Sequence, residues 1–207
     1  MSVDLYSMFY IIETLGIIAF AISGMILARK KSFDIVGIYI IGGVTALGGG
    51  TIRDVMLDIQ PLYWIQHSEY PLILLAIAIL MASLKKVTIQ EKWLVIPDAI
   101  GMAIFSITTA QMAIQMNLPI IIVGILSTVV AAFGGVLRDS LCQEIPMIFR
   151  KESTLYASLA FANGVAFAIL ARFEGLSQNL SLVICVIFTF LFRLIAYKYN
   201  LKFSLSK

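Results

Sequence analysis

Apolar residues form long continuous runs along the whole chain, and short polar stretches separate the runs. A helix needs about 20 apolar residues to cross a membrane, whereas a membrane-spanning strand shows about ten residues of alternating pattern. The runs do not alternate and are rich in Leu, Ile, Ala and Met, so they predict helices. Seven membrane spans are expected, over residues 9–27, 33–59, 71–84, 93–116, 119–143, 154–171 and 180–197.

Charged and turn-forming residues end these spans. The basic stretch 29–31 follows the first span, Pro61 stops the second, and Pro146 stops the fifth. The first run begins near Phe9 without a basic segment before it, which favours a retained span over a cleaved signal peptide.

Basic residues indicate how the chain is oriented, because Lys and Arg are enriched in cytoplasmic loops. If the stretch 29–31 is cytoplasmic, the N-terminus lies outside and the C-terminus lies inside. The other basic residues then expected on the cytoplasmic side are Lys85, Lys86, Lys92, Arg150, Lys151, Lys198, Lys202 and Lys207. The outer loops carry Asp4, His67, Glu69 and Glu174, with Arg172 as the one basic exception.

Composition supports the same class of protein. The chain of 207 residues is 60% hydrophobic and 13% charged, with a mean hydropathy of +0.98. A soluble domain is closer to half apolar and a quarter charged. We therefore expect an all-α membrane protein, with one transmembrane domain over residues 1–207, membrane lipids around it and no nucleic-acid partner.

A glycine-rich motif inside the second run occurs again inside the fifth. Residues 48–54 read Gly-Gly-Gly-Thr-Ile-Arg-Asp, and residues 133–139 read Phe-Gly-Gly-Val-Leu-Arg-Asp, at an offset of 85 residues. The same offset relates further pairs outside the motif: Glu13 and Asp98, Gly16 and Gly101, Phe20 and Phe105, Ser23 and Thr108, and Pro61 and Pro146. The sequence therefore predicts two copies of one three-helix unit.

The predicted copies are repeat one over residues 7–86 and repeat two over residues 92–171, and the seventh helix over 178–199 stands outside them. Because three spans is an odd number, the second copy must enter the membrane from the opposite side. This predicts two inverted three-helix repeats plus a seventh helix. The second span then carries its charged pair toward the outer half of the membrane, and the fifth carries its pair toward the inner half.

Charged residues inside apolar runs are the main candidates for function, because each is expensive in a membrane. The candidates are Arg53, Asp54, Arg138, Asp139, Glu13 and Asp98. Each Arg-Asp pair either lines a pathway or is a structural ion pair near the interface, where Arg can reach the surface. Glu13 and Asp98 each require a partner, although Asp98 follows Pro97 and could instead cap the start of its helix.

The glycines of the motif predict a hinge or break in each helix, at Gly48, Gly49 and Gly50 and at Gly134 and Gly135. The alternative is close helix packing, which we favour for Gly16, Gly24 and Gly101. The two breaks are expected to face each other near the membrane midplane. Hydroxyl groups flank them at Thr45, Thr51, Ser127 and Thr128, and these either line a pathway or bond carbonyls of their own helix.

Several chemistries are not supported. Residues 48–51 lack the Lys-Ser/Thr that a phosphate-binding loop needs. No Ser/His/Asp set and no cluster of metal ligands is evident, and His67 is expected to be a solvated loop residue. We therefore expect neither an enzyme nor a metal or cofactor site.

The doubled motif resembles the bacterial UPF0126 family, also called the glycine-transporter-domain family, which is related to the trimeric intracellular cation (TRIC) channels. The resemblance implies a homotrimer in the bacterial inner membrane, with a pore through each protomer, kinked pore-lining helices at the second and fifth spans, and potassium as the conducted ion. The chain departs from the pattern at Phe133, which replaces the first glycine of the triplet.

Two functional hypotheses follow. In a passive channel for monovalent cations, the carboxylates of Asp54 and Asp139 attract cations while Arg53 and Arg138 pair with them. In a secondary transporter of a small zwitterion such as glycine, as the family's other name implies, freed amides bind the carboxylate and Glu13 or Asp98 binds the ammonium group. A weaker third reading is a membrane protein whose repeat serves packing alone.

Overall fold

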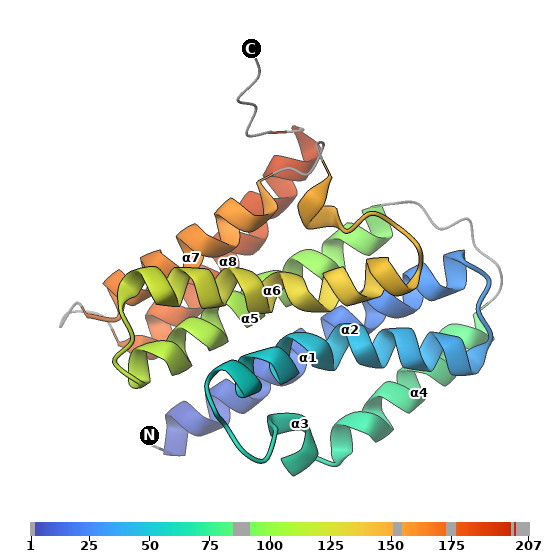
Figure 1. Cartoon of the computed structure of the whole chain (residues 1–207), viewed down its shortest axis with the longest axis horizontal. Helices are drawn as coiled ribbons and strands as arrows, with labels where there is room; N and C mark the ends of the chain where they lie inside the picture. The colour runs from blue at the N-terminus through green and yellow to red at the C-terminus, as the bar shows by residue number, and fades with distance from the viewer. Residues whose placement is uncertain (1–2, 85–91, 151–154, 173–176, 200, 202–207) are drawn as a thin grey trace.

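The computed structural model describes residues 3–84, 92–150, 155–172, 177–199 and 201, and every assigned element among them is a helix (Figure 1). Five helices are long and apolar enough to cross a membrane, and α4 and α7 are shorter apolar helices. The elements are α1 Val3–Lys30, α2 Ile35–Met56, α3 Tyr63–Gln66, α4 Glu69–Ser83, α5 Lys92–Gln115, α6 Ile120–Leu141, the 3₁₀ helix η1 Met147–Phe149, α7 Tyr156–Leu170 and α8 Gln178–Lys198.

Each predicted span coincides with a helix, although the ends differ by several residues and α4 and α7 have only 15 residues each. Polar side chains stabilise some of these ends: the Asp34 carboxylate accepts a hydrogen bond from the Gly37 N–H at 2.7 Å and so caps α2. The sequence did not predict α3 and η1, because three or four residues are too few to show a hydrophobic period.

The two predicted copies share their local backbone structure. Helices α2 and α6 have 22 residues each and lie 85 residues apart in the sequence. Left-handed residues precede them at Ser32 and Asn117, with φ of 60° and 57°, and follow them at Asp58 and Gln143, with φ of 53° and 56°. The repeated sequence therefore produces the same helix and the same turns twice.

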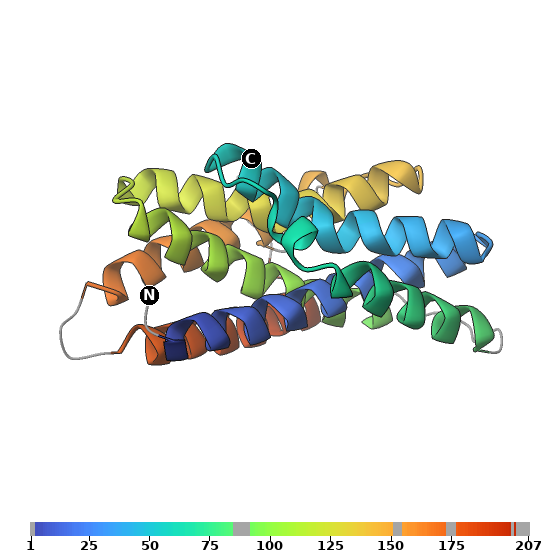
Figure 2. The same ribbon diagram turned by 90° about the horizontal axis from the view of Figure 1, so that it is seen from below.

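Four helices form the centre of the bundle (Figures 1 and 2). Helix α1 packs on α2 and α5, and α6 packs on the same two helices. Helix α4 lies against α2 and α1, and α7 lies against α6 and α5. Helix α8 packs on α5 and α7, so it covers the second half of the chain.

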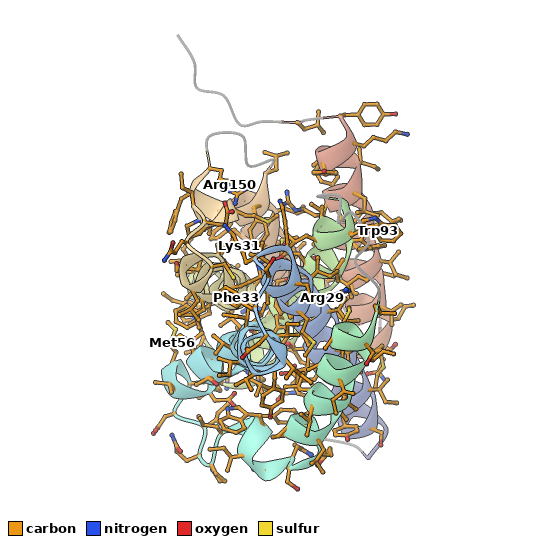
Figure 3. All side chains as sticks on the ribbon, turned by 90° about the vertical axis from the view of Figure 1, so that its right-hand side faces the viewer. Arg29, Lys31, Phe33, Met56, Trp93 and Arg150 are labelled. Carbon is orange, nitrogen blue, oxygen red and sulfur yellow. The ribbon has the colours of Figure 1, made fainter. Side chains whose placement is uncertain are left out.

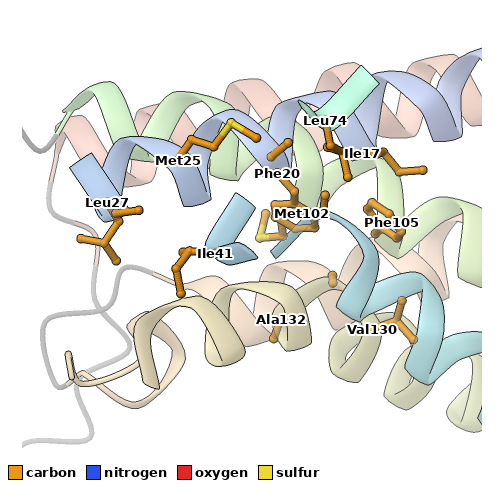
Figure 4. Close-up of a cluster of buried hydrophobic side chains, with 14 of the residues drawn as sticks. Ile17, Phe20, Met25, Leu27, Ile41, Leu74, Met102, Phe105, Val130 and Ala132 are labelled. Atoms are coloured by element: carbon orange, nitrogen blue, oxygen red, sulfur yellow. The ribbon is translucent and has the colours of Figure 1, made fainter. Parts of the chain in front are cut away.

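The core is built on reciprocal contacts between the two copies, and Figure 4 shows its central side chains. The rings of Phe20 and Phe105 stack with centroids 5.3 Å apart. Phe105 lies against Gly16, and Phe20 lies against Gly101. A Cβ atom at either glycine would collide with a neighbouring side chain, so the predicted packing role of these two glycines is confirmed.

A break of the helix at the motif glycines is wrong, whereas a hinge there stays a prediction. Helices α2 and α6 are continuous through them, and no described glycine has a positive φ. The glycines instead permit backbone contact: a Cβ at Gly49 would lie 2.8 Å from the Val130 carbonyl oxygen, and a Cβ at Gly134 would collide with the carbonyl of Thr45. Unbroken helices keep their hydrogen bonds satisfied, as an apolar surrounding requires. The glycines of the two helices do face each other, as predicted.

Basic residues from both copies meet at one end of the bundle, which Figure 3 shows with Arg29, Lys31 and Arg150 labelled. Lys31 Nζ lies 2.7 Å from the carboxylate of Glu144, and Arg29 donates to the carbonyl of Leu84 at 2.8 Å. Other charges used to predict orientation lie outside the described residues or have side chains outside them: Asp4, Lys85, Lys86, Lys92, Lys151, Glu174, Lys202 and Lys207.

Candidate functional site: two buried arginine–carboxylate clusters

The first cluster consists of Glu13 on α1 and Arg53 and Asp54 on α2, all at most 1% exposed. Arg53 Nη1 donates to Glu13 Oε1 at 2.5 Å, and Arg53 Nε donates to Asp54 Oδ1 at 2.9 Å. One guanidinium thus joins two carboxylates, one from its own helix and one from the neighbouring helix. This pairing offsets the cost of burying the arginine.

The segment after α2 folds over the first cluster. The second oxygen of Asp54 accepts a hydrogen bond from the Tyr63 N–H at 2.7 Å, and the Tyr63 ring centroid lies 5.9 Å from Arg53 Cζ. The Trp64 indole N–H donates to Thr51 Oγ1 at 3.1 Å. These bonds fix α3 over the end of α2.

The second cluster consists of Asp98 on α5 and Arg138 and Asp139 on α6, at the positions equivalent to the first. Arg138 Nη1 donates to Asp98 Oδ1 at 2.7 Å, and Arg138 Nε donates to Asp139 Oδ1 at 2.8 Å. The other oxygen of Asp139 accepts from the Met147 N–H at 2.9 Å. The repeated sequence therefore builds one ionic arrangement twice.

The two clusters differ in their additional contacts. Arg138 also donates to the hydroxyl of Ser23 on α1 and lies 3.7 Å from Met147 Sδ. The residue equivalent to Ser23 is Thr108, whose hydroxyl lies 3.5 Å from the Phe105 carbonyl of its own helix. The second cluster is thus bonded to both halves of the chain.

Each cluster carries one guanidinium and two carboxylates, which leaves a formal charge of −1 when all three groups are ionised. Among the described residues, Glu13 Oε2 and Asp98 Oδ2 are buried and have no hydrogen-bond partner. Buried charge is costly without a counter-charge. Each cluster can therefore accept one further cation or hydrogen-bond donor.

A small cavity lies beside the first cluster. Its volume is about 10 Å³, and its lining includes Glu13, Gly50, Arg53, Asp54 and Trp64. This is close to the space that a single water-sized particle needs. The rest of the lining consists of Tyr63 and of apolar residues.

The candidate hydroxyls mostly bond their own helices. Thr45 donates to the Ile41 carbonyl, Thr51 to Leu47 and Thr128 to Gly124, at 2.6, 2.8 and 2.8 Å. The hydroxyl of Ser127 has no partner among the described residues, and Ser127 lies against Gly164 of α7. The structure thus favours the local alternative for the three threonines.

For two single residues, Asp98 and His67, the structure shows more than the sequence predicted. Asp98 does not cap a helix: α5 begins at Lys92 and continues through Pro97, because burial beside Arg138 holds Asp98 inside the helix. His67 lies in the loop between α3 and α4, as predicted, but its side chain is only 18% exposed, because its ring packs on Tyr10, Tyr63 and Tyr70 with centroids 5.2, 4.5 and 5.7 Å away. Its Nδ1 lies 2.9 Å from Glu69 Oε1, since the loop folds back onto α1.

Arg193 on α8 and Tyr156 on α7 were not predicted from the sequence. Arg193 is 3% exposed, and its Cζ lies 4.7 Å from the centroid of the Tyr156 ring. A single arginine inside the last apolar run was the signal that could have identified it, by the same argument as for Arg53.

Comparison with known proteins gives consistent matches. The family model described as "Glycine transporter" matches residues 10–86 and again residues 95–172. The chain is 34% identical to a UPF0126 membrane protein of Vibrio cholerae, over 97% of this chain and 85% of the relative. It is 32% identical to the UPF0126 inner membrane protein YadS of Escherichia coli, over 93% of each.

Solved structures of similar proteins share the fold. One is the TRIC trimeric intracellular cation channel orthologue from Rhodobacter sphaeroides, with a TM-score of 0.83 and 32% identity, over 93% of this chain and 98% of that one. Another is a prokaryotic TRIC channel crystallised in 0.5 M KCl, with a TM-score of 0.86 and 32% identity, over 94% of this chain and 98% of that one.

Proposed function

The chain belongs to the glycine-transporter family of UPF0126 membrane proteins, and from this membership we propose that it is a channel through which monovalent cations, potassium above all, pass without energy input. The similar solved structures are described as cation channels and not as enzymes. The observation that carries the proposal is the pair of buried, negatively charged clusters at equivalent positions of α2 and α6.

The proposed arrangement in the membrane has seven spans, with α4 and α7 as the short ones. Residues 7–86 and 92–171 form inverted repeats, and α8, within residues 178–199, stands outside them. The reciprocal contacts of Phe20 and Phe105 support a two-fold relation between the copies. The basic end of the bundle supports an outer N-terminus and a cytoplasmic C-terminus in the bacterial inner membrane.

The proposed assembly is a homotrimer in which each protomer has its own pathway. Support comes from the Rhodobacter sphaeroides protein, whose description calls it trimeric.

The proposed pathway passes both clusters beside the crossing of α2 and α6. Carboxylates there attract cations and repel anions, while the paired arginines hold the carboxylates in place. Because the backbones of the two helices touch at Gly49 and Gly134, conduction requires these helices to move apart at the crossing. The nearest atoms to Gly49 and Gly134 are backbone carbonyls, so at these two points the helices can separate without side chains that interlock there, whereas Leu137 of α6 packs on Gly48.

Current across a planar bilayer that contains the purified protein tests the proposal. Under a potassium gradient we expect unitary steps that reverse near the potassium equilibrium potential. A membrane that stays silent at high protein density, with the protein intact, contradicts a channel.

Replacing Asp139 by Asn tests the pathway at the second cluster. The amide keeps the shape of the side chain but removes one negative charge, so we expect the unitary potassium current to fall by about tenfold, the lower end of what a charged cleft contributes to local ion concentration. Glu144→Gln is the matched control, because its carboxylate lies outside both clusters. Equal currents for Asp139→Asn and wild type would remove this residue from the pathway.

Glycine transport is the second candidate, and the description of the family model favours it. Such a carrier needs free helix-end amides for the substrate carboxylate, but α2 and α6 are continuous at their glycines. Uptake of labelled glycine into proteoliposomes decides between the two: saturable uptake together with electrical silence replaces the channel proposal.

A further inference from the structure

We propose that a pocket between α7 and α8 binds a small lipophilic molecule of one-ring size that carries a hydroxyl group, such as a phenol. Asn163 of α7 and Thr189 of α8 hold the hydroxyl group of this ligand. The pocket is lined by residues of α7 and α8 alone and contains no member of the charged clusters. The ligand site therefore does not depend on whether the protein conducts ions.

The pocket is a hollow on the outer surface of the bundle, where α7 packs on α8 (Figure 1). Asn163 and Thr189 are the buried polar residues of its lining, whereas Ala166 and Phe188 are exposed and form part of its rim. Its volume is about 210 Å³. An apolar cavity of about 150 Å³ already binds benzene, so one ring fits here.

The surroundings of the pocket select a lipophilic ligand. Asn163 lies at the middle of α7, and Thr189 lies close to the middle of α8, and both helices are apolar. The interior of a bilayer offers little water to a polar group at this depth. A molecule that enters the pocket therefore comes from the lipid phase.

The hydroxyl group of Thr189 is the first indication of a ligand. Thr189 is fully buried, and its Oγ1 has no hydrogen-bond partner among the described residues. By contrast, the hydroxyl groups of Thr45, Thr51 and Thr128 bond carbonyls of their own helices at 2.6, 2.8 and 2.8 Å. A buried hydroxyl without a partner is costly, so a ligand oxygen that reaches Thr189 gains a bond that α8 does not supply.

Asn163 supplies the complementary group. The hydroxyl of Ser106 donates to the Ala103 carbonyl at 2.9 Å, so its oxygen must accept from Asn163 Nδ2, which lies 2.7 Å away. This bond assigns the amide nitrogen of Asn163 to Ser106 and leaves the amide oxygen as an acceptor. A ligand hydroxyl suits both residues, because it accepts from Thr189 and donates to Asn163.

The sequence repeat indicates that the fold does not require these polar groups. At the offset of 85 residues, Asn163 corresponds to Ala78 and Ser106 corresponds to Ala21. Both alanines are fully buried in the core. Helix α8 lies outside the two regions that the family model matches, and it packs on α5 and α7 of the second copy. The polar pair Ser106 and Asn163 thus occurs in the copy that α8 covers.

Phenol and toluene, titrated separately into the detergent-purified full-length protein, test the proposal. The two molecules have the same ring and differ in one group, a hydroxyl in place of a methyl. A ligand that binds the folded protein raises its thermal unfolding midpoint, from which the two affinities follow. Loss of either ligand to detergent is the same for every variant, so the ratio of the two affinities is compared between variants.

Thr189→Val removes the hydroxyl group and keeps the shape of the side chain. We expect the ratio of phenol affinity to toluene affinity to fall about threefold to tenfold, which is the effect of one hydrogen bond. Ala166→Leu places a larger side chain at the pocket and is expected to abolish the binding of both ligands. Ala82→Leu, at an exposed alanine of α4, is the matched control and leaves both affinities unchanged.

Three results would overturn the proposal: a wild type that phenol does not stabilise, an unchanged affinity ratio in Thr189→Val, or an Ala166→Leu protein that binds phenol as the wild type does. An unchanged ratio would mean that any apolar filling, a lipid chain included, suits the pocket. If a variant does not fold, crystals of the wild type soaked with 4-bromophenol decide. A bromine peak between α7 and α8 supports the proposal, and the absence of a peak there refutes it.

Discussion

Arg53 and Arg138 are the residues on which both clusters depend. Each is fully buried and bonds a carboxylate next to it in sequence and another 40 residues before it. A buried ion pair gives little net stability over an apolar replacement, but the loss of one partner leaves an uncompensated charge. The arginines therefore make the burial of the carboxylates possible.

Arg53→Gln tests this dependence. The change leaves Glu13 and Asp54 buried without a cation, so we expect a loss of about 3–5 kcal/mol in the free energy of unfolding. Unfolding of the detergent-purified protein, followed by loss of helical circular dichroism, measures it.

The double variant Arg53→Gln, Glu13→Gln is the control, because it removes one of the two buried carboxylates that Arg53→Gln leaves without a counter-charge. We expect the double variant to be more stable than Arg53→Gln alone, because substitutions at two residues in contact do not have additive effects on stability. Additive losses would mean that Glu13 and Arg53 do not interact.

At the scale of the element, the crossing of α2 and α6 explains why glycines occupy the middle of two apolar helices. Glycine is a poor helix former, so its presence requires a reason from outside the helix. The reason is contact with a facing backbone: Gly49 lies against the carbonyl of Val130, and Gly134 against that of Thr45.

Gly49→Ala is expected to destabilise the protein by about 1–3 kcal/mol, because the added methyl group must push α2 away from α6. Gly43, on the same helix, is a matched control, since a Cβ there meets nothing within 4 Å. Gly43→Ala should be neutral or stabilise by up to about 1 kcal/mol. Thermal unfolding of both variants measures the difference, and equal midpoints would show that the crossing tolerates a side chain.

At the scale of the whole molecule, an ion pair joins the turn between α1 and α2 to the segment after α6. The hydrogen bond from Lys31 lowers the pKa of Glu144 from its ordinary value, and the charges of Lys31 and Arg150 act in the same direction. The equivalent positions at the other end, Ile59 and Met116, carry no charge, so only one end of the bundle has this connection.

This pair predicts how stability varies with pH. A carboxyl group with a lowered pKa in the folded protein stabilises it above the unfolded pKa, and that contribution is lost as pH falls through the folded pKa. We expect Glu144→Gln to be less stable than wild type at neutral pH, by less than about 1 kcal/mol because both partners are a third exposed. The difference in unfolding midpoint should vanish below about pH 3; a constant difference would assign the effect to packing.

The sequence by itself determined the helices and the repeat. Long apolar runs in a chain with few charges leave no alternative to membrane helices, and the family model matches twice, where the repeat was predicted. The charged residues of the clusters were also identifiable, because an ionised group in an apolar run is rare enough to be noticed wherever it lies. The seven-span count and the inversion of the repeats remain proposals.

Only the tertiary structure decided what those residues contact. Helix α2 is continuous through Gly48, Gly49 and Gly50, and the backbone of α6 lies against it there. No local sequence pattern predicts how closely two helices approach each other. The same holds for the pairing of Arg53 with Glu13 and for the approach of Arg193 to Tyr156. Hydrophobic periodicity predicts which residues are buried, whereas the packing between helices determines which side chains these residues contact.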